Sequence, residues 1–341
     1  MLLDLKDRKI LCALDRDARQ SSSQIAKTVG LSSQVVGFRM QRLIERKFIS
    51  WFYTVINIGK LGFTSHKNFI RLQNCDKGQE QIIIKFLVEH PNVLWVAQCD
   101  GRFDLVFATW SQDMLSLNSM LREFQQKFSQ FVAERQIAPI IRGEYFSRDY
   151  LVNRKRDLGR KVWAFGGPSE TVTLDLHDWQ ILSVLSNAAR KTCVEIGVRV
   201  GLSPDAVAKR IVRLKATQVI RHFNIVPNEA VFPYLHYKIL LSWKKYDERR
   251  ELGFAEYCAA QPHIVYLCKV LGPWDFEIDL EVATAQEYRD IMMEIKSVFS
   301  DILREYSVLH IYQVHKYNFC PSVPEECVSE LKPLRTFISH S

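Results

Sequence analysis

The apolar positions of the N-terminal fifty residues repeat with helical spacing. Ile10 and Leu14 give the first predicted helix its apolar stripe. Ser21 and Gln24 stand three residues apart as a capping box, which predicts the start of a second helix. Gly30 suits the left-handed turn that ends this helix. A third helix follows directly, and two helices joined by a short glycine-containing turn are typical of a helix-turn-helix.

After residue 49 the pattern changes to aromatic and β-branched runs, which indicate strands. The first strand covers residues 51–56, and a second module follows it. The elements of this module alternate in the order βαββαβ, which is the ferredoxin-like arrangement. We predict its strands at residues 68–73, 93–98, 103–110 and 132–141, and its helices at residues 79–90 and 114–129.

The whole pattern occurs twice, with a constant offset of 171 positions. LDLKDRKIL, which begins at Leu3, is matched by LDLHDWQIL, which begins at Leu174. We therefore predict an α+β chain in which two winged helix-turn-helix domains alternate with two ferredoxin-like, ACT-type domains. The second module of repeat 2 is predicted at residues 236–241, 253–260, 264–270, 276–282, 286–299 and 306–314. The expected divisions are residues 1–60, 61–150, 174–230 and 231–320, with a linker at 151–173 and a tail at 321–341.

Composition narrows the classes of function. No apolar run reaches the ~18 residues that cross a bilayer, and the N-terminus lacks a signal-peptide pattern, so we expect a cytoplasmic protein without a membrane partner. The eight cysteines form no Cys-x-x-Cys pair and the histidines lack metal spacing, so we expect no metal and no cofactor. Enzyme motifs are absent as well, which argues against an enzyme. The net charge of +8 is concentrated in residues 1–50, 142–161 and 174–222, as expected for a double-stranded DNA partner.

The third helix of each repeat carries the candidate DNA-binding residues. Such a recognition helix enters the major groove N-terminus first, where Arg and Gln side chains form paired hydrogen bonds with guanine and adenine edges. Asp205 would repel phosphate, so we expect repeat 2 to prefer another sequence and to bind more weakly. The candidates are Ser32, Ser33, Gln34, Phe38, Arg39, Gln41, Arg42 and Arg46 in repeat 1 and Ser203, Asp205, Lys209, Arg210 and Arg213 in repeat 2.

Three alternatives stay open for this basic region. The polar residues of a single helix also suit a face that is merely solvated. Phe38 also suits a half-buried position against the wing. The segment at residues 142–161 suits contact with the DNA backbone, but it equally suits a solvated linker.

A Gly-x-x-Asp turn in the second module is the candidate effector site. A tight connection between strands favours glycine, and the following aspartate suits a cap on the backbone. The sharper hypothesis is that backbone amides beside the glycine bind a carboxylate while an aspartate binds an amine. The residues concerned are Asp100, Gly101, Arg102 and Asp104 in repeat 1 and Gly272 and Asp275 in repeat 2.

Both repeats resemble the Lrp/AsnC (leucine-responsive, or feast/famine) family of transcription regulators. The motifs that carry the resemblance are LDLKDRKIL…ARQSSSQIAKTVGLSSQVVGFRMQRLIERKFI and LDLHDWQIL…ARKTCVEIGVRVGLSPDAVAKRIVRLKATQVI, and it covers about residues 3–150 and 174–317. It implies a hinge strand between each helix-turn-helix and an ACT-like domain, self-association through that domain, and a response to amino acids. Lys47 and Gln218 depart from a common family glycine, and Pro273 replaces Arg102, which puts an effector site in repeat 2 in doubt.

The duplication suggests that one chain imitates a family dimer, with the two sheets paired internally. Two other functions stay open on the same fold. Siroheme decarboxylases resemble it and also occur as fused pairs, and they use His and Arg in the second module on a tetrapyrrole. An assembly protein that has lost DNA binding is the remaining alternative.

Overall fold

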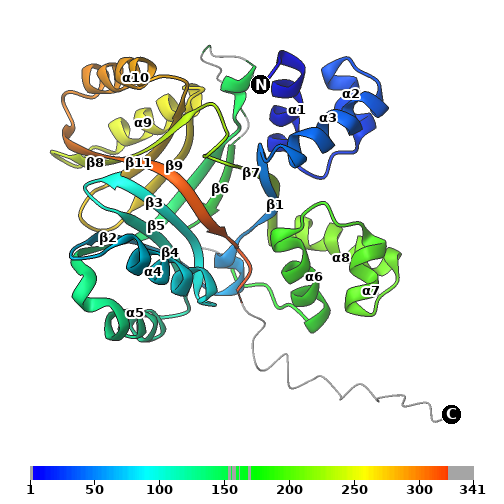
Figure 1. The fold of residues 1–341 in the computed structure, drawn as a ribbon, viewed down its shortest axis with the longest axis horizontal. Coiled ribbons are helices and arrows are strands. Elements are labelled where there is room, and N and C mark those ends of the chain that lie inside the picture. Colours follow the sequence, from blue (N-terminus) through cyan, green and yellow to red (C-terminus); the bar gives the residue numbers. More distant parts are fainter. Residues whose placement is uncertain (1–2, 153–154, 156–158, 161, 168–169, 322–341) are drawn as a thin grey trace, which may run out of the picture.

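The computed structural model describes residues 3–152, 155, 159–160, 162–167 and 170–321. Two three-helix domains lie together on one side of a larger β-structure that carries four helices on its outside (Figure 1). The helical domains comprise α1 (Leu5–Arg16), α2 (Ser22–Val29) and α3 (Ser33–Glu45), and α6 (Leu176–Asn187), α7 (Cys193–Val200) and α8 (Pro204–Ala216).

The predicted caps of the helix-turn-helix are confirmed. Ser21 and Gln24 form a capping box, and Thr192 and Glu195 form the equivalent box in repeat 2. Gly30, with φ 68°, ends α2 in the left-handed conformation, as the equivalent glycine ends α7. Both repeats therefore aim their third helix by the same local geometry.

A two-stranded ribbon joins the two helical domains. Strand β1 (Ile49–Ile56) pairs antiparallel with β7 (Ile220–Pro227), so each repeat supplies one strand of a shared wing. The contacts are reciprocal, because the amide of Ala189 donates to the carbonyl of Phe52 while the amide of Ala18 donates to that of Phe223. Each strand thus contacts the helices of the other repeat.

The two ferredoxin-like modules follow the predicted order of elements. Module 1 contains β2 (Thr64–Leu72), α4 (Lys77–Glu89), β3 (Val93–Gly101), β4 (Leu105–Ser111), α5 (Met114–Phe128) and β5 (Val132–Phe146). Module 2 contains β8 (Leu235–Trp243), α9 (Glu248–Ala260), β9 (Ile264–Val270), β10 (Phe276–Val282), α10 (Ala285–Val298) and β11 (Leu303–Tyr317).

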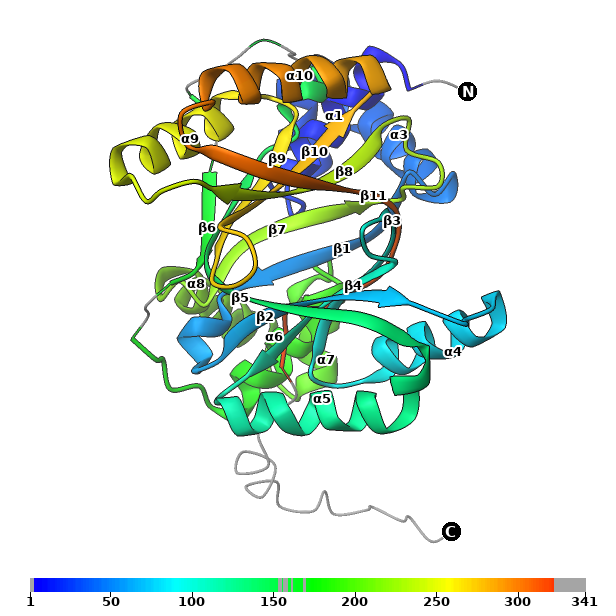
Figure 2. The same ribbon diagram turned by 90° about the vertical axis from the view of Figure 1, so that its left-hand side faces the viewer.

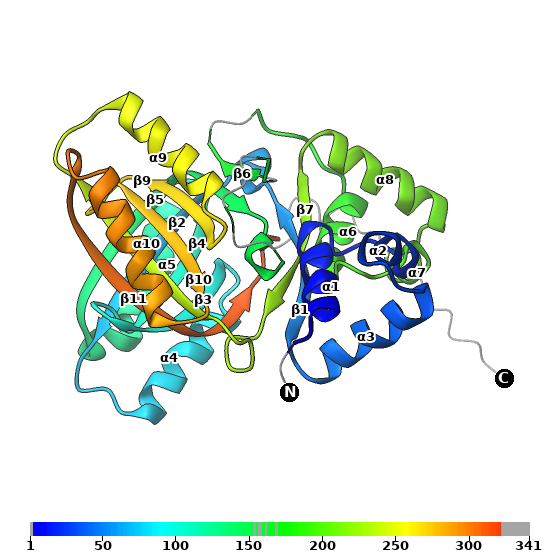
Figure 3. The same cartoon turned by 90° about the horizontal axis from the view of Figure 1, so that it is seen from above.

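The last strand of each module is longer than predicted because it crosses into the other module. The first part of β5 pairs with β2, and its end pairs with β9. Likewise β11 pairs first with β8 and then with β3. Eight strands therefore close into a ring in the order β2-β4-β3-β11-β8-β10-β9-β5, since β5 returns to β2. The helix pairs α4/α5 and α9/α10 flank this barrel on the outside (Figures 2 and 3).

The segment between the repeats is more structured than the predicted linker. Strand β6 (Val162–Gly166) lies inside it and pairs with the end of β5. The ring of Phe165 covers Gly143, where a Cβ atom would clash with it. Both alternatives for residues 142–161 are wrong at Arg148 and Arg160, which are buried rather than solvated or facing DNA. The predicted tail lies almost wholly outside the described residues.

In the described part of the chain, no helix is both long and apolar enough to cross a bilayer. Seven cysteines fall within that part, and all of them are free thiols. The same residues contain no cluster of three or more His, Cys, Asp or Glu side chains arranged to hold a metal ion.

The two residues that replace the common family glycine, Lys47 and Gln218, have strained backbone conformations. Lys47 has φ 59° and Gln218 has φ 61°, the left-handed region that side chains with a Cβ disfavour by about 1–2 kcal/mol. A glycine has more conformational freedom in the unfolded chain, and the loss of this freedom on folding offsets about 0.5–1 kcal/mol of the stability gained by relieving the strain. We therefore expect Lys47→Gly to raise the free energy of unfolding by about 0.5–1 kcal/mol in urea titrations. Lys47→Ala keeps the strain, and an equal gain from that variant would contradict the explanation.

Candidate nucleic-acid interface and central cavity

The recognition helices α3 and α8 each present a stripe of exposed side chains to solvent. Gln34, Phe38 and Gln41 are spaced as one face of α3, and all three are exposed. Phe38 is 69% exposed, so the half-buried alternative for this ring is wrong. Ser33 and Arg46 are exposed at the two ends of the helix.

A serine side chain caps the N-terminus of each recognition helix. The Ser32 hydroxyl accepts a hydrogen bond from the amide of Val35 at 3.2 Å, and Ser203 accepts one from Ala206 at 3.2 Å. Ser32 and Ser203 are both exposed. The unpaired amides of these first turns are suited to a phosphate oxygen.

Two of the arginines predicted to contact DNA in repeat 1 form ion pairs within the protein, which the sequence analysis did not predict. Arg39 donates to Asp4 at 2.7 Å and to Asp7 at 2.8 Å, and Arg42 donates to both oxygens of Asp7 at 2.9 Å. These ion pairs, which we call the arginine clamp, connect α3 to the start of α1. Direct base contact by these two arginines stays a prediction.

Repeat 2 contains the same clamp at the equivalent positions. Arg210 donates to Asp175 and to Asp178, and Arg213 pairs with Asp178. Burial alone would raise the pKa of Asp175, but the hydrogen bond from Arg210 lowers it below its usual value. Because the clamp recurs, its role is to position the recognition helix against the first helix.

The exposed stripe of α8 differs in chemistry from that of α3. The positions that correspond to Gln34, Phe38 and Gln41 are Asp205, Lys209 and Val212. All three of these residues are exposed. The two helices therefore present different side chains, although equivalent caps and ion pairs position both of them.

The Gly-x-x-Asp turns have the structural role that the sequence left open. Asp104 accepts a hydrogen bond from the Leu72 amide at 2.6 Å, and Asp275 accepts one from Trp243 at 2.7 Å. The cap on the backbone is thus confirmed for both aspartates.

Backbone atoms of the other module and paired side chains surround both turns closely. Gly101 has φ 129°, and a Cβ atom there would fall on the carbonyl oxygen of Val308 in the other module. A Cβ at Gly272 would meet the Ile137 carbonyl at 3.0 Å. Arg102 pairs with Glu134 at 3.1 Å, and Asp100 accepts from the Gly101 amide. A ligand role for these residues stays a prediction.

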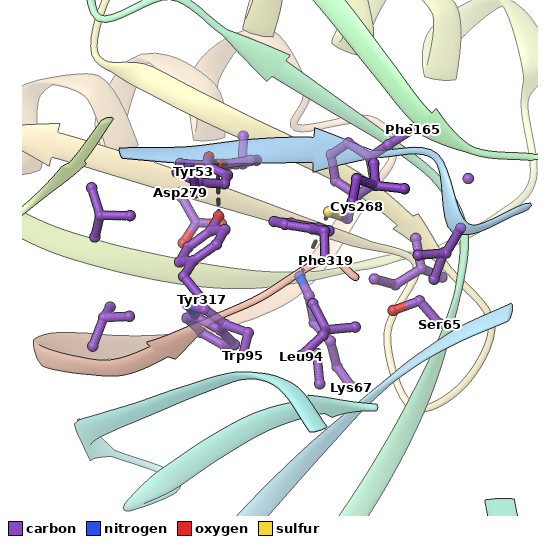
Figure 4. Close-up of a pocket in the computed structure, with 18 of the residues that line it drawn as sticks. Tyr53, Ser65, Lys67, Leu94, Trp95, Phe165, Cys268, Asp279, Tyr317 and Phe319 are labelled. Carbon is purple, nitrogen blue, oxygen red and sulfur yellow. Dashed lines mark hydrogen bonds between the residues drawn. The ribbon is translucent and has the colours of Figure 1, made fainter. Parts of the chain in front are cut away.

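A cavity of about 430 Å³ lies between the shared wing and the barrel, and the sequence analysis did not anticipate it. Its wall is mostly aromatic and aliphatic, with side chains such as Tyr53 from β1, Trp95 from β3 and Tyr317 from β11 (Figure 4). Phe165 from β6 and Phe319 also line it. Distant parts of the chain therefore meet in one place.

A strip of buried ion pairs forms one side of this cavity. Lys67 donates to Glu277 at 2.5 Å, and Lys238 donates to both oxygens of Asp279 at 2.7 and 2.8 Å. Burial alone would lower the pKa of Lys67, but the adjacent Cys268 and Glu277 raise it above its usual value. Nε2 of His236 lies 2.8 Å from Oδ1 of Asp279.

Arg148 continues the strip and connects it to a helix-turn-helix. Its guanidinium donates to Glu281 at 2.8 Å and to Asp15 of α1 at 2.7 Å. Burial alone would raise the pKa of Glu281, but the charge of Arg148 lowers it below its usual value. One buried cation thus links α1 of repeat 1 to β10 of repeat 2.

Comparison with known proteins identifies the family. The AsnC-type helix-turn-helix domain matches residues 3–44 and 174–215. A proline dehydrogenase transcriptional activator of Rhizobium radiobacter is 32% identical over 124 residues, which cover 36% of this chain and 78% of the relative. The regulator Ptr1 of Methanocaldococcus jannaschii is 32% identical over 122 residues, 36% of this chain and 81% of that protein. The chain belongs to the Lrp/AsnC family. It is a transcription regulator of this type with two helix-turn-helix domains.

A solved structure shares the fold of the whole duplicated chain. The siroheme decarboxylase NirDL superposes with a TM-score of 0.59 over 94% of this chain and 96% of its own. A second structure of NirDL, in complex with an iron-uroporphyrin III analogue, gives a TM-score of 0.60. Sequence identity is 15% and 14%, so the likeness concerns the fold alone.

The cavity residue Glu229 makes a pH-dependent prediction. Burial raises its pKa above the usual 4.5, so stability is lost as the pH rises from that value through the folded-state pKa. We expect Glu229→Gln to increase the free energy of unfolding at pH 7. Below about pH 4 the carboxyl is largely protonated in both states, so the gain should vanish there. Urea titrations of both proteins at the two pH values measure it, and a gain that is equal at both would contradict the assignment.

Proposed function

We propose that this regulator binds duplex DNA sequence-specifically, with one chain acting as a family dimer does. The observation that carries the proposal is the exposed Gln34, Phe38 and Gln41 stripe on a capped third helix. Glutamine side chains at such positions can form paired hydrogen bonds with adenine. Arg39 and Arg42 are paired with Asp4 and Asp7, whereas the side chains of this stripe are exposed and available to base edges.

The reciprocal packing of the helical domains supports the imitation of a dimer. Arg19 donates to the Ala189 carbonyl at 2.6 Å, and Arg190 donates to the carbonyls of Ala18 and Gln20. Successive major grooves on one side of DNA lie ~34 Å apart, and a paired arrangement of recognition helices suits them. The two halves would read different half-sites, because α3 and α8 expose different residues.

An amino-acid effector and further association of chains through the ACT-type modules belong to the proposal as family properties. The turn residues predicted for an effector have backbone partners, which leaves the central cavity as an alternative place for a small molecule.

A tetrapyrrole enzyme is the second candidate, and the shared fold with NirDL together with the cavity favours it. Its chemistry argues against it here, because tetrapyrrole acid side chains need available cations. Lys67, Lys238 and Arg148 are already paired with carboxylates of β10. We propose that the chain is not such an enzyme.

A charge exchange between the recognition helices tests DNA binding. Gln34→Asp places an anion beside the phosphates, and we expect at least about fivefold weaker binding to the selected operator, or about 1 kcal/mol. Asp205→Gln removes such an anion and should tighten binding. Fluorescence anisotropy with a labelled duplex at two salt concentrations measures both, and salt should weaken all variants steeply.

Gln126→Asp is the matched control for this exchange, because it makes the same change of charge on the exposed side of α5. It should leave the affinity unchanged. Equal effects of Gln34→Asp and Gln126→Asp would show that only net charge matters and would contradict base reading by α3.

Titration with iron-uroporphyrin III tests the second candidate. We expect no saturable shift of the Soret band at micromolar protein, since the cations of the cavity are occupied. A stoichiometric shift that is lost in Lys67→Met would instead support the tetrapyrrole site.

A further inference from the structure

The two modules of the chain provide an internal comparison for the buried charges of the cavity. Glu277, Asp279 and Glu281 alternate along β10 and therefore lie on one face of this strand, whose residues are all buried. At the equivalent positions of module 1 the chain has Val106, Ala108 and Trp110. All three carboxylates are at most 5% exposed.

The same three strand positions are therefore apolar in module 1 and acidic in module 2. Burying ion pairs removes both charges from water, and this cost often exceeds what the pairs return in stability. Because module 1 folds without them, the fold itself does not require these acids. Buried polar groups without a folding role point to a binding function when they adjoin a cavity.

Each cation of this strip already has a carboxylate partner. Lys67 pairs with Glu277 and Lys238 pairs with Asp279, while Arg148 pairs with both Glu281 and Asp15. Burial raises the pKa of Glu229, which favours its neutral form. A ligand with a net charge would have to break one of the pairs or remain unpaired itself, so the cavity favours an uncharged molecule.

The remaining wall indicates an aromatic body for that molecule. The hydroxyl of Tyr266 lies 3.2 Å from that of Tyr53 and 2.7 Å from that of Tyr317, so three tyrosines form a hydrogen-bonded chain beside the apolar rings. Each hydroxyl oxygen can accept as well as donate, so the chain retains acceptor positions for a donor on a ligand. The rings of Tyr53 and Phe319 lie stacked at 5.8 Å, next to Tyr317 (Figure 4).

The position of the cavity connects it to DNA binding. Tyr53 and Ile56 of β1 and Ile225 and Val226 of β7 line it on the side of the helical domains. These strands form the shared wing that joins the two recognition units. A molecule in the cavity would contact the ribbon on one side and the barrel on the other.

We propose that this cavity is an effector site for an uncharged aromatic small molecule with one hydrogen-bond donor, and that its occupation changes the affinity for DNA. The site itself stands independently of the DNA-binding function, whereas the effector role rests on the proposed function. Coupling between the two sites must be reciprocal, since each ligand changes the affinity of the other by the same factor.

Two dyes with the same ring system test the charge preference. N-phenyl-1-naphthylamine is uncharged, and 8-anilinonaphthalene-1-sulfonate carries a sulfonate on the same body. We expect the fluorescence of the uncharged dye to rise saturably at one dye per chain, with at least tenfold weaker binding of the sulfonate. No saturable binding of the uncharged dye, or equal binding of both, overturns the proposal.

Variants that fill the cavity locate the dye. Ser65→Phe and Val314→Phe each add a ring to a different wall and should weaken binding at least tenfold, with thermal melting as the check of folding. Two positions are chosen so that failure of one variant to fold leaves the other. Ser119→Phe adds the same ring to an exposed site on α5 and should have no effect. Unchanged binding in a folded cavity variant overturns the site.

The effector role is measured on wild-type protein. Saturating dye should change the Kd for the operator at least threefold, and saturating operator should change the Kd for the dye by the same factor. Dye binding without any change in DNA affinity overturns the effector role and leaves the site. Absence of DNA binding altogether would instead contradict the proposed function, and the dye titration would still test the cavity.

Discussion

The antiparallel pairing of β1 with β7 is the interaction on which the rest of the molecule depends. It lets each hinge strand contact the helices of the other repeat, as the reciprocal bonds of Ala18 and Ala189 show. The crossing strands β5 and β11 do the same for the barrel, where each completes the sheet of the other module. Because both partners belong to one chain, the pairing is intramolecular and does not depend on protein concentration.

Duplication within one chain also frees the two halves to differ. The clamp of acid and arginine that positions each recognition helix is the same in both repeats, at Asp7 with Arg42 and at Asp178 with Arg213. The residues that face outward from those helices are different. One face of β10 is acidic where the equivalent face of β4 has Val106, Ala108 and Trp110, and the cavity lies beside the acidic face. A family member that pairs two identical chains could not contain this asymmetry.

The sequence predicts the local structure well, because caps and periodicity act over a few residues. Ser21, Thr192 and the two αL glycines are examples, and the order of elements in both modules follows as well. It does not predict where β5 and β11 end, since their second halves are defined by strands of the other module. The arginine clamp was missed because its partners lie 32–35 residues apart. The signal for the cavity was present as alternating acids at residues 277, 279 and 281, which a comparison of the two repeats would have shown.

Counting the chains on a two-half-site duplex tests the central claim most directly. Mass photometry at nanomolar concentration, combined with footprinting of the same complex, gives the stoichiometry and the protected grooves together. The account predicts one chain per duplex and protection of two successive major grooves on one side of the helix. Protection of a single groove by one chain, with a second chain needed for the other, would contradict it.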